Sequence, residues 1–153
     1  MFYYGNTIKG TPVGAKSIFA IGSVTKTFTA TMVALLDKRH KVHVSDGSSS
    51  SQAETKLSDV FSACTLPQKR QSITLAELAD HHSGLPKRPP DTVSTVQKLW
   101  NDLCRSAAGD FPKNEFHYSN YAFAVLGHVM VPIYGASSWS NANAEAITGP
   151  PSG

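Results

Sequence analysis

The stretch from residue 23 to residue 36 is the part of this sequence that most constrains how the chain can fold. Apolar residues recur along it at the spacing of an α-helix: Phe28, Met32, Leu35 and Leu36. Most other positions hold Ala or Thr, and no charged residue occurs between Lys26 and Asp37. Because a helix without a charged face is usually buried, this pattern predicts a helix that is buried on all sides at the centre of the fold.

Capping and turn signals predict further short helices. Thr74-Leu75-Ala76-Glu77 has the form of a capping box. We expect the helix that it opens to stop at residues 83–86, where Gly84 can adopt positive φ and Pro86 cannot continue a helix. Apolar spacing predicts a helix or turn at 57–66, and helices over 92–107, after Ser119-Asn120, and over 140–147. The apolar face predicted for the 92–107 helix carries Val93, Val96, Trp100 and Leu103.

These elements predict a single domain, which suits a chain of 153 residues. Residues 1–22 are expected to form a short strand or hairpin followed by a loop, because Tyr, Phe, Ile and Thr alternate there with Gly and Pro. Residues 23–148 are predicted as a helical region interrupted by a polar loop at 45–56, and residues 149–153 as a tail. The fold class is therefore predominantly α-helical, with a small contribution of strand.

Charge and composition argue against several function classes. The net charge is +3, and 41% of the residues are hydrophobic, which is typical of a globular protein. Basic residues cluster only at 38–41 and at 87–88, without the interleaved aromatic residues of a nucleic-acid surface. No apolar run is long enough to predict a membrane span, and the first residues do not predict a signal peptide. The sequence leaves the cellular compartment open.

Cysteine and histidine residues point only weakly to a site. Cys64 and Cys104 fit either one disulfide or two buried thiols, and their spacing, which matches no metal or redox motif, favours thiols. His40 and His43 have a spacing that could serve a metal, but no Cys, Asp or Glu beside them completes a ligand set. The prediction is therefore that the chain uses neither a metal nor an organic cofactor.

Ser23 and Lys26 are the first candidates for chemistry. A serine becomes a good nucleophile only when a nearby base accepts its proton. At this spacing both side chains lie on one side of the first helical turn, and the positive potential of the helix N-terminus, together with burial, would favour the neutral lysine that can accept a proton. The spacing alone favours an N-capping serine followed by a lysine that faces solvent.

Three stretches of the sequence together resemble one known family. They are Phe19-Ala20-Ile21-Gly22-Ser23-Val24-Thr25-Lys26, residues 73–86 with His82-Ser83-Gly84-Leu85-Pro86, and Phe116-His117-Tyr118-Ser119-Asn120-Tyr121. In this order they resemble the class C β-lactamases and their relatives, the D-alanyl-D-alanine peptidases and the family VIII esterases. Three ordered matches are far more specific than one short motif.

The resemblance implies a fold, an activity and further site residues. It implies the helical part of an α+β fold of the β-lactamase/transpeptidase type, and a serine hydrolase that acts through an acyl-enzyme on β-lactams, D-alanyl peptides or small esters. Ser23, Lys26 and Tyr118 would be catalytic, with Tyr118 sharing the proton, and Asn120 would bind the substrate. Without the resemblance, Tyr118 is better interpreted as a buried tyrosine and Asn120 as a helix N-capping residue.

The sequence also departs from the family pattern. The family carries a third motif, such as Lys-Thr-Gly, on a strand beside the active site, and none of the residues after Asn120 spells it. Most of the central sheet is expected to be missing as well. The chain would then be a fragment of a longer enzyme, a short hydrolase completed by other groups, or an impaired homologue that serves as an interaction or remnant module. Helix faces left without a sheet favour a homo-oligomer or a completing chain as partner, beside the small-molecule substrate.

Overall fold

The computed structural model describes residues 2–39, 54–89, 95–105 and 109–149. Within these ranges the chain is mainly helical, and its only β-structure is a pair of isolated bridges, Asn6 with Pro12 and Lys56 with Thr74. The predominantly helical fold class is therefore confirmed. The helices are η1 (Gly22–Val24), α1 (Thr25–Arg39), α2 (Leu57–Val60), α3 (Gln68–Gln71), α4 (Leu75–Ala79), α5 (Val96–Cys104), α6 (Asn120–Ile133) and α7 (Trp139–Thr148).

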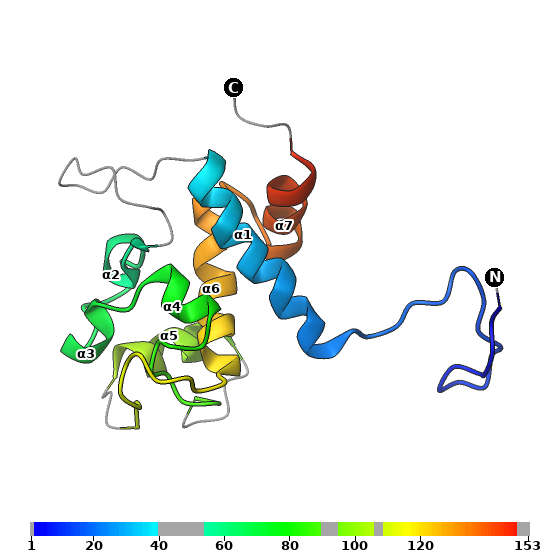
Figure 1. Ribbon diagram of the computed structural model, residues 1–153, viewed down its shortest axis with the longest axis horizontal. Coiled ribbons are helices and arrows are strands. Elements are labelled where there is room, and N and C mark those ends of the chain that lie inside the picture. The colour runs from blue at the N-terminus through cyan, green and yellow to red at the C-terminus, as the bar shows by residue number, and fades with distance from the viewer. Residues whose placement is uncertain (1, 40–53, 90–94, 106–108, 150–153) are drawn as a thin grey trace.

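The core forms where α1 packs against α4, α6 and α7 (Figure 1). Met32 and Leu36 of α1 are fully buried, as are Leu126 and Met130 of α6. Two polar contacts join α1 to the end of α6 and the start of α7. The Tyr134 hydroxyl donates to the carbonyl of Met32 at 2.8 Å, and the indole N–H of Trp139 donates to the Thr29 hydroxyl at 3.2 Å.

One face of α1 is exposed, so the prediction of a helix buried on all sides is wrong. Phe28 of α1 is 40% exposed, and Val24 of the preceding η1 is 58% exposed. The hydroxyl of Thr27 donates to the carbonyl of Val24 at 2.7 Å, and that of Thr31 donates to the carbonyl of Thr27 at 2.8 Å. These threonines satisfy their polar groups on the helix itself, and the absence of charge from this face therefore does not imply burial.

The N-terminal segment, residues 2–21, lies apart from the helices (Figure 1). It contains a tight turn, in which the Gly10 amide donates to the carbonyl of Thr7 at 2.8 Å and the Val13 amide donates to that of Gly5 at 3.1 Å. The hairpin predicted here is therefore present as a turn with a single antiparallel bridge. Phe2, Tyr4, Ile8 and Ile18 are all almost fully exposed.

Local signals placed several helix boundaries correctly. The capping box is confirmed, since the Glu77 amide donates to the Thr74 hydroxyl at 3.1 Å and the Thr74 amide donates to the Glu77 carboxylate at 2.8 Å. Helices α6 and α7 begin at or beside the predicted residues. Helix α4 is shorter than predicted, because it ends at Ala79 and His81 takes a positive φ of 70°.

Other helix predictions need correction. Helix α3 was not predicted from the sequence, and α2 ends at Val60 rather than near residue 66. Helix α5 begins at Val96 with Thr95 as its N-cap, whereas both predicted ends of this helix lie outside the described residues. Val96 is 44% exposed instead of part of the apolar face, because it occupies the first turn of the helix. The polar loop at 45–56 lies mostly outside the described residues, and the proposed division of the chain remains a prediction.

Cys64 and Cys104 form a disulfide, so the preference for two thiols is wrong. Their Cα atoms are 6.1 Å apart across a sequence separation of 40 residues. This separation carries no local signal, and only the packing of α5 beside the segment between α2 and α3 brings the two residues together. The bond ties this part of the chain to the core, in which Leu99 and Leu103 of α5 are buried.

A buried ion pair stabilises the same region. The Arg70 side chain is 2% exposed and donates to both carboxylate oxygens of Asp110, at 2.7 and 2.8 Å. It also donates to the carbonyls of Asp102 and Leu103, each at 2.9 Å. Because the guanidinium uses several donors at once, its burial is compensated, and it joins α3 to the end of α5.

None of the helices in the described part of the chain reaches the length and apolar character that a membrane crossing requires.

The disulfide gives a direct test of this architecture. We expect replacement of both Cys64 and Cys104 by Ser to lower the free energy of unfolding by about 2–4 kcal/mol, because the unfolded chain gains freedom when the loop is opened. Urea titration followed by circular dichroism would measure the difference. A reducing agent should destabilise the wild-type chain and leave the double variant unchanged. Equal stability of the two proteins under oxidising conditions would contradict the prediction.

Candidate active site

Ser23 lies in η1 and Lys26 in the first turn of α1, so one helix N-terminus presents both side chains. Gly22 has a positive φ of 54°, a conformation that glycine adopts without steric cost. The Lys26 ammonium donates to the Ser23 hydroxyl at 3.3 Å. The Ser23 amide belongs to the first turn of the helix, whose N–H groups have no intrahelical acceptor, and it can therefore donate to an external oxygen.

Tyr118 provides the shortest contact to Ser23. Its phenolic oxygen lies 2.8 Å from the Ser23 Oγ, although the two residues are 95 positions apart in the sequence. The Lys26 Nζ lies 5.0 Å from the centre of the Tyr118 ring. Two hydrogen bonds lower the pKa of Tyr118 from its usual value near 10: the larger effect comes from Lys26 and the smaller from Ser23. The three side chains thus form a hydrogen-bonded cluster in which a proton can move between oxygen atoms.

Ser119 and the segment around Pro86 hold this cluster against the core. The Ser119 hydroxyl accepts from the Ala122 amide at 2.8 Å, as the N-cap of α6, and donates to the carbonyl of Pro86 at 2.7 Å. Ser119 is fully buried. The helix cap is therefore Ser119, while Asn120 is the first residue of α6 and its side chain is left available. The backbone N–H of Asn120 donates to the carbonyl of Lys87 at 3.0 Å, and this hydrogen bond fixes the backbone at the start of the helix.

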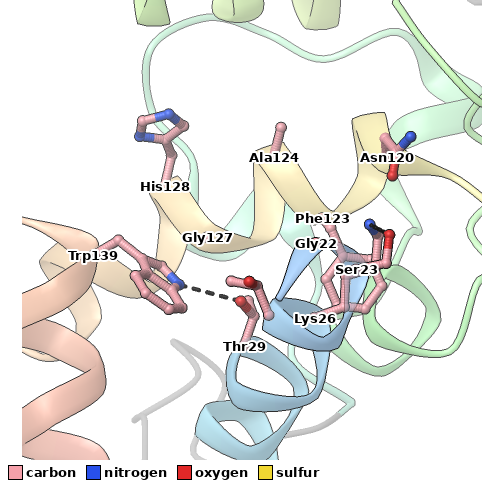
Figure 2. A pocket seen from close by; sticks show the side chains of 11 residues that line it. Gly22, Ser23, Lys26, Thr29, Asn120, Phe123, Ala124, Gly127, His128 and Trp139 are labelled. Atoms are coloured by element: carbon pink, nitrogen blue, oxygen red, sulfur yellow. Dashed lines mark hydrogen bonds between the residues drawn. The ribbon is translucent and has the colours of Figure 1, made fainter. Parts of the chain in front are cut away.

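An open cavity of about 460 Å³ adjoins this cluster (Figure 2). Its lining comes from η1, α1, α6 and Trp139 of α7: Gly22, Ser23, Thr25, Lys26, Thr29, Asn120, Phe123, Ala124, Gly127, His128 and Trp139. Gly127 allows the indole of Trp139 to approach, since a Cβ atom there would lie 3.3 Å from the Trp139 ring. The cavity therefore has a polar end at Ser23 and Asn120 and an apolar wall formed by Phe123 and Trp139.

The four residues singled out in the sequence lie together. Ser23, Lys26 and Asn120 share the cavity lining, and Tyr118 contacts Ser23. The roles assigned to them remain predictions. The sequence did not single out His81, whose ring packs on Tyr118 with 4.5 Å between ring centres. Its place beside Tyr118 depends on the packing of two segments that are far apart in the sequence, and the stretch 73–86 gave no sign of this contact.

No three His, Cys, Asp or Glu side chains gather as a metal site requires within residues 2–39, 54–89, 95–105 and 109–149. His40 and His43, the pair with possible ligand spacing, lie outside these ranges.

The described fold matches a helical part of the fold of the serine β-lactamases and related penicillin-binding enzymes. The family model for β-lactamase matches residues 2–151, and the chain belongs to this family. Beta-lactamase-like protein 1 of Dictyostelium discoideum is 28% identical over 147 residues, which cover 85% of this chain. The family is one of serine hydrolases, and the resemblance found in the sequence is therefore confirmed.

Two solved structures resemble the chain. The class C β-lactamase of Rhodobacter sphaeroides is 26% identical, with a TM-score of 0.68 over 93% of this chain. The β-lactamase/D-alanine carboxypeptidase of Pseudomonas syringae is 20% identical, with a TM-score of 0.57 over 96% of this chain, and this likeness supports the fold alone. The chain spans 37% and 36% of these two proteins and 23% of the Dictyostelium relative.

Ser119 offers a test of how the site is held. We expect Ser119→Ala to lower the free energy of unfolding by about 1–2 kcal/mol, because it removes the N-cap of α6 and leaves the carbonyl of Pro86 without its donor. Thermal and urea unfolding would measure the loss. Ser138→Ala is the matched control, since the exposed Ser138 caps α7 in the same way but has no partner like Pro86. A smaller loss for Ser119→Ala than for Ser138→Ala would contradict the prediction.

Proposed function

We propose that this chain is the nucleophile-bearing part of a serine hydrolase that forms an acyl-enzyme on Ser23. The contact that carries the proposal is the 2.8 Å approach of Tyr118 to Ser23, with Lys26 at 3.3 Å from the same oxygen. A serine that contacts both a tyrosine of lowered pKa and an ammonium has a proton acceptor and a source of charge stabilisation at hand.

The first step is attack of the Ser23 oxygen on the carbonyl carbon of the substrate. In the deprotonated form of Tyr118, the phenolate accepts the Ser23 proton, and the Lys26 ammonium stabilises the phenolate before this transfer. The carbonyl oxygen becomes an oxyanion, to which the Ser23 amide can donate. Lys26 was considered from the sequence as the proton acceptor, but the shorter contact and the lowered pKa favour Tyr118.

The second step releases the leaving group. The tetrahedral intermediate collapses, the bond to the leaving group breaks, and Tyr118 returns its proton to the leaving nitrogen or oxygen. Water then attacks the acyl carbon while Tyr118 accepts its proton. The bond between the acyl carbon and the Ser23 oxygen breaks, Tyr118 returns the proton to that oxygen, and the acid is released. Asn120, with one acceptor and two donors on its side-chain amide, would orient the substrate in the cavity. Substrates in this proposal are β-lactams, D-alanyl peptides or small esters.

A second candidate is an impaired homologue that serves as an interaction or remnant module. The observation that favours it is a row of exposed apolar residues beside the site: Phe19, Ile21, Val24 and Phe28 are 40–66% exposed. An exposed apolar surface of this kind suits contact with another chain or with a second copy. A measurement of solution mass would show whether the chain associates.

Acylation provides the test that separates these two candidates. Incubation with p-nitrophenyl acetate should add an acyl group to the wild-type chain, detected by intact mass, and Ser23→Ala should remain unmodified. A small activated ester demands fewest contacts, and we therefore expect ester hydrolysis to exceed hydrolysis of penicillin G. Ser17→Ala is the control for loss of a serine elsewhere in the chain. If neither substrate gives an adduct or turnover, the enzymatic proposal fails for this chain.

Tyr118 should control the pH dependence of the reaction. Because its pKa is lowered, we expect kcat/KM for the ester to rise with pH and to level off below pH 10, once the phenol has lost its proton. Tyr118→Phe should remove this rise and reduce kcat/KM by about 10²–10⁴-fold, the usual contribution of a positioned acid or base. Tyr4→Phe, at an exposed position, should behave as wild type. An unchanged pH profile in Tyr118→Phe would assign the proton to another group.

A further inference from the structure

His81 accepts hydrogen bonds from the two residues on either side of Tyr118. Its carbonyl accepts from the His117 amide at 2.9 Å, and its ring Nδ1 accepts from the Ser119 amide at 3.1 Å. The residues immediately before and after Tyr118 are therefore both bonded to one histidine. Neither bond belongs to regular secondary structure, because His81 follows the end of α4 and residues 117 and 119 precede α6.

The ring of His81 also supports the Tyr118 side chain directly. The ring centres lie 4.5 Å apart at an angle of 37°. Phe123 and Phe116 surround the same imidazole, with centres 5.0 and 5.6 Å away. Displacement of this imidazole would remove a wall that sets where the Tyr118 hydroxyl lies relative to Ser23.

The backbone of His81 is held in a conformation that histidine seldom adopts. Its φ is 70°, in the left-handed region, which is strained for a residue other than glycine. Such a conformation persists where surrounding contacts compensate for it. Here the compensation comes from the two hydrogen bonds and the ring contacts around Tyr118.

The hydrogen bond to Ser119 depends on the charge of the imidazole. Because Nδ1 accepts a hydrogen bond from the Ser119 amide, it carries no proton itself, and the neutral ring holds its proton on Nε2. An imidazolium would place N–H on Nδ1, facing the N–H of Ser119, and the hydrogen bond would be lost. The ionisable groups that face His81 are Lys26 from α1, Asp80 at the end of α4, the neighbouring His82 and Tyr118 itself.

We propose that His81 is a positioning residue, which holds Tyr118 against Ser23 while its imidazole is neutral and releases it when the imidazole is protonated. The proposal rests on the role of Tyr118 in acyl transfer described above. Burial lowers the pKa of His81 below its usual 6.5, and the charge of Lys26 adds a smaller effect in the same direction. The neutral imidazole, which supports Tyr118, therefore predominates at neutral pH. Below that pKa the Ser119 bond breaks and the contact between Tyr118 and Ser23 weakens.

The test follows Tyr118 by NMR of protein labelled with ¹³C at the phenolic carbon, with its signal assigned through Tyr118→Phe. The wild-type signal should show an inflection below pH 6.5, where the His81 ring gains its proton. His81→Asn should abolish this inflection, because Asn tolerates positive φ and offers an acceptor that does not titrate in this range. His82→Asn, the adjacent histidine on the same loop, should keep it. An inflection that persists in His81→Asn overturns the proposal.

Ester hydrolysis supplies the functional readout. His81→Leu should lose about tenfold to a hundredfold in kcat/KM at pH 7, the scale expected when a reacting group is misplaced by about 1 Å. His81→Asn should recover part of this loss and should lack the additional fall below pH 6.5 seen in wild type. Equal rates for wild type and His81→Leu overturn the proposal. If no protein turns over ester while the NMR inflection behaves as expected, the proposed function fails and the positioning by His81 stands.

Discussion

The packing of α1 against α6 is the constraint on which the rest of the structure depends. Leu36 of α1 and Met130 of α6 are fully buried in the core that this packing creates. The same packing brings the N-terminal ends of the two helices together, so Tyr118, directly ahead of α6, meets Ser23 ahead of α1. The apolar contacts are remote from the chemistry but set the distance between the two oxygens.

A second layer of contacts holds the segment that carries Tyr118. Residues 81–86 and 111–119 lie side by side. Backbone hydrogen bonds join them, from the amide of Phe111 to the carbonyl of Gly84 and from the amide of His117 to the carbonyl of His81. Gly84 has a φ of 75°, and a Cβ atom there would lie 2.5 Å from the carbonyl oxygen of Phe111. Only glycine permits this approach. The sequence around Gly84 therefore serves the site indirectly, by letting one loop lie closely on the other.

Exposed apolar residues of η1 and α1 lie next to the nucleophile. Val24 and Phe28 face away from the described core, next to the nucleophile, and the chain covers little more than a third of the solved class C β-lactamase. In the second candidate function, another chain or a second copy contacts this surface. Covering it would exclude water from Ser23 and strengthen the electrostatic interactions of Lys26 and Tyr118, because a lower local dielectric screens charges less.

The sequence by itself determined the features whose causes are local. The capping box at Thr74, the start of α6 after Ser119 and the proximity of Ser23 to Lys26 follow from contacts within a few residues, and the ordered motifs identified the family. Only the tertiary structure decided which side of α1 is covered, that Cys64 meets Cys104, and that His81 supports Tyr118. These depend on how separate elements pack, because residues distant in the chain carry no signal of one another until the fold brings them into contact.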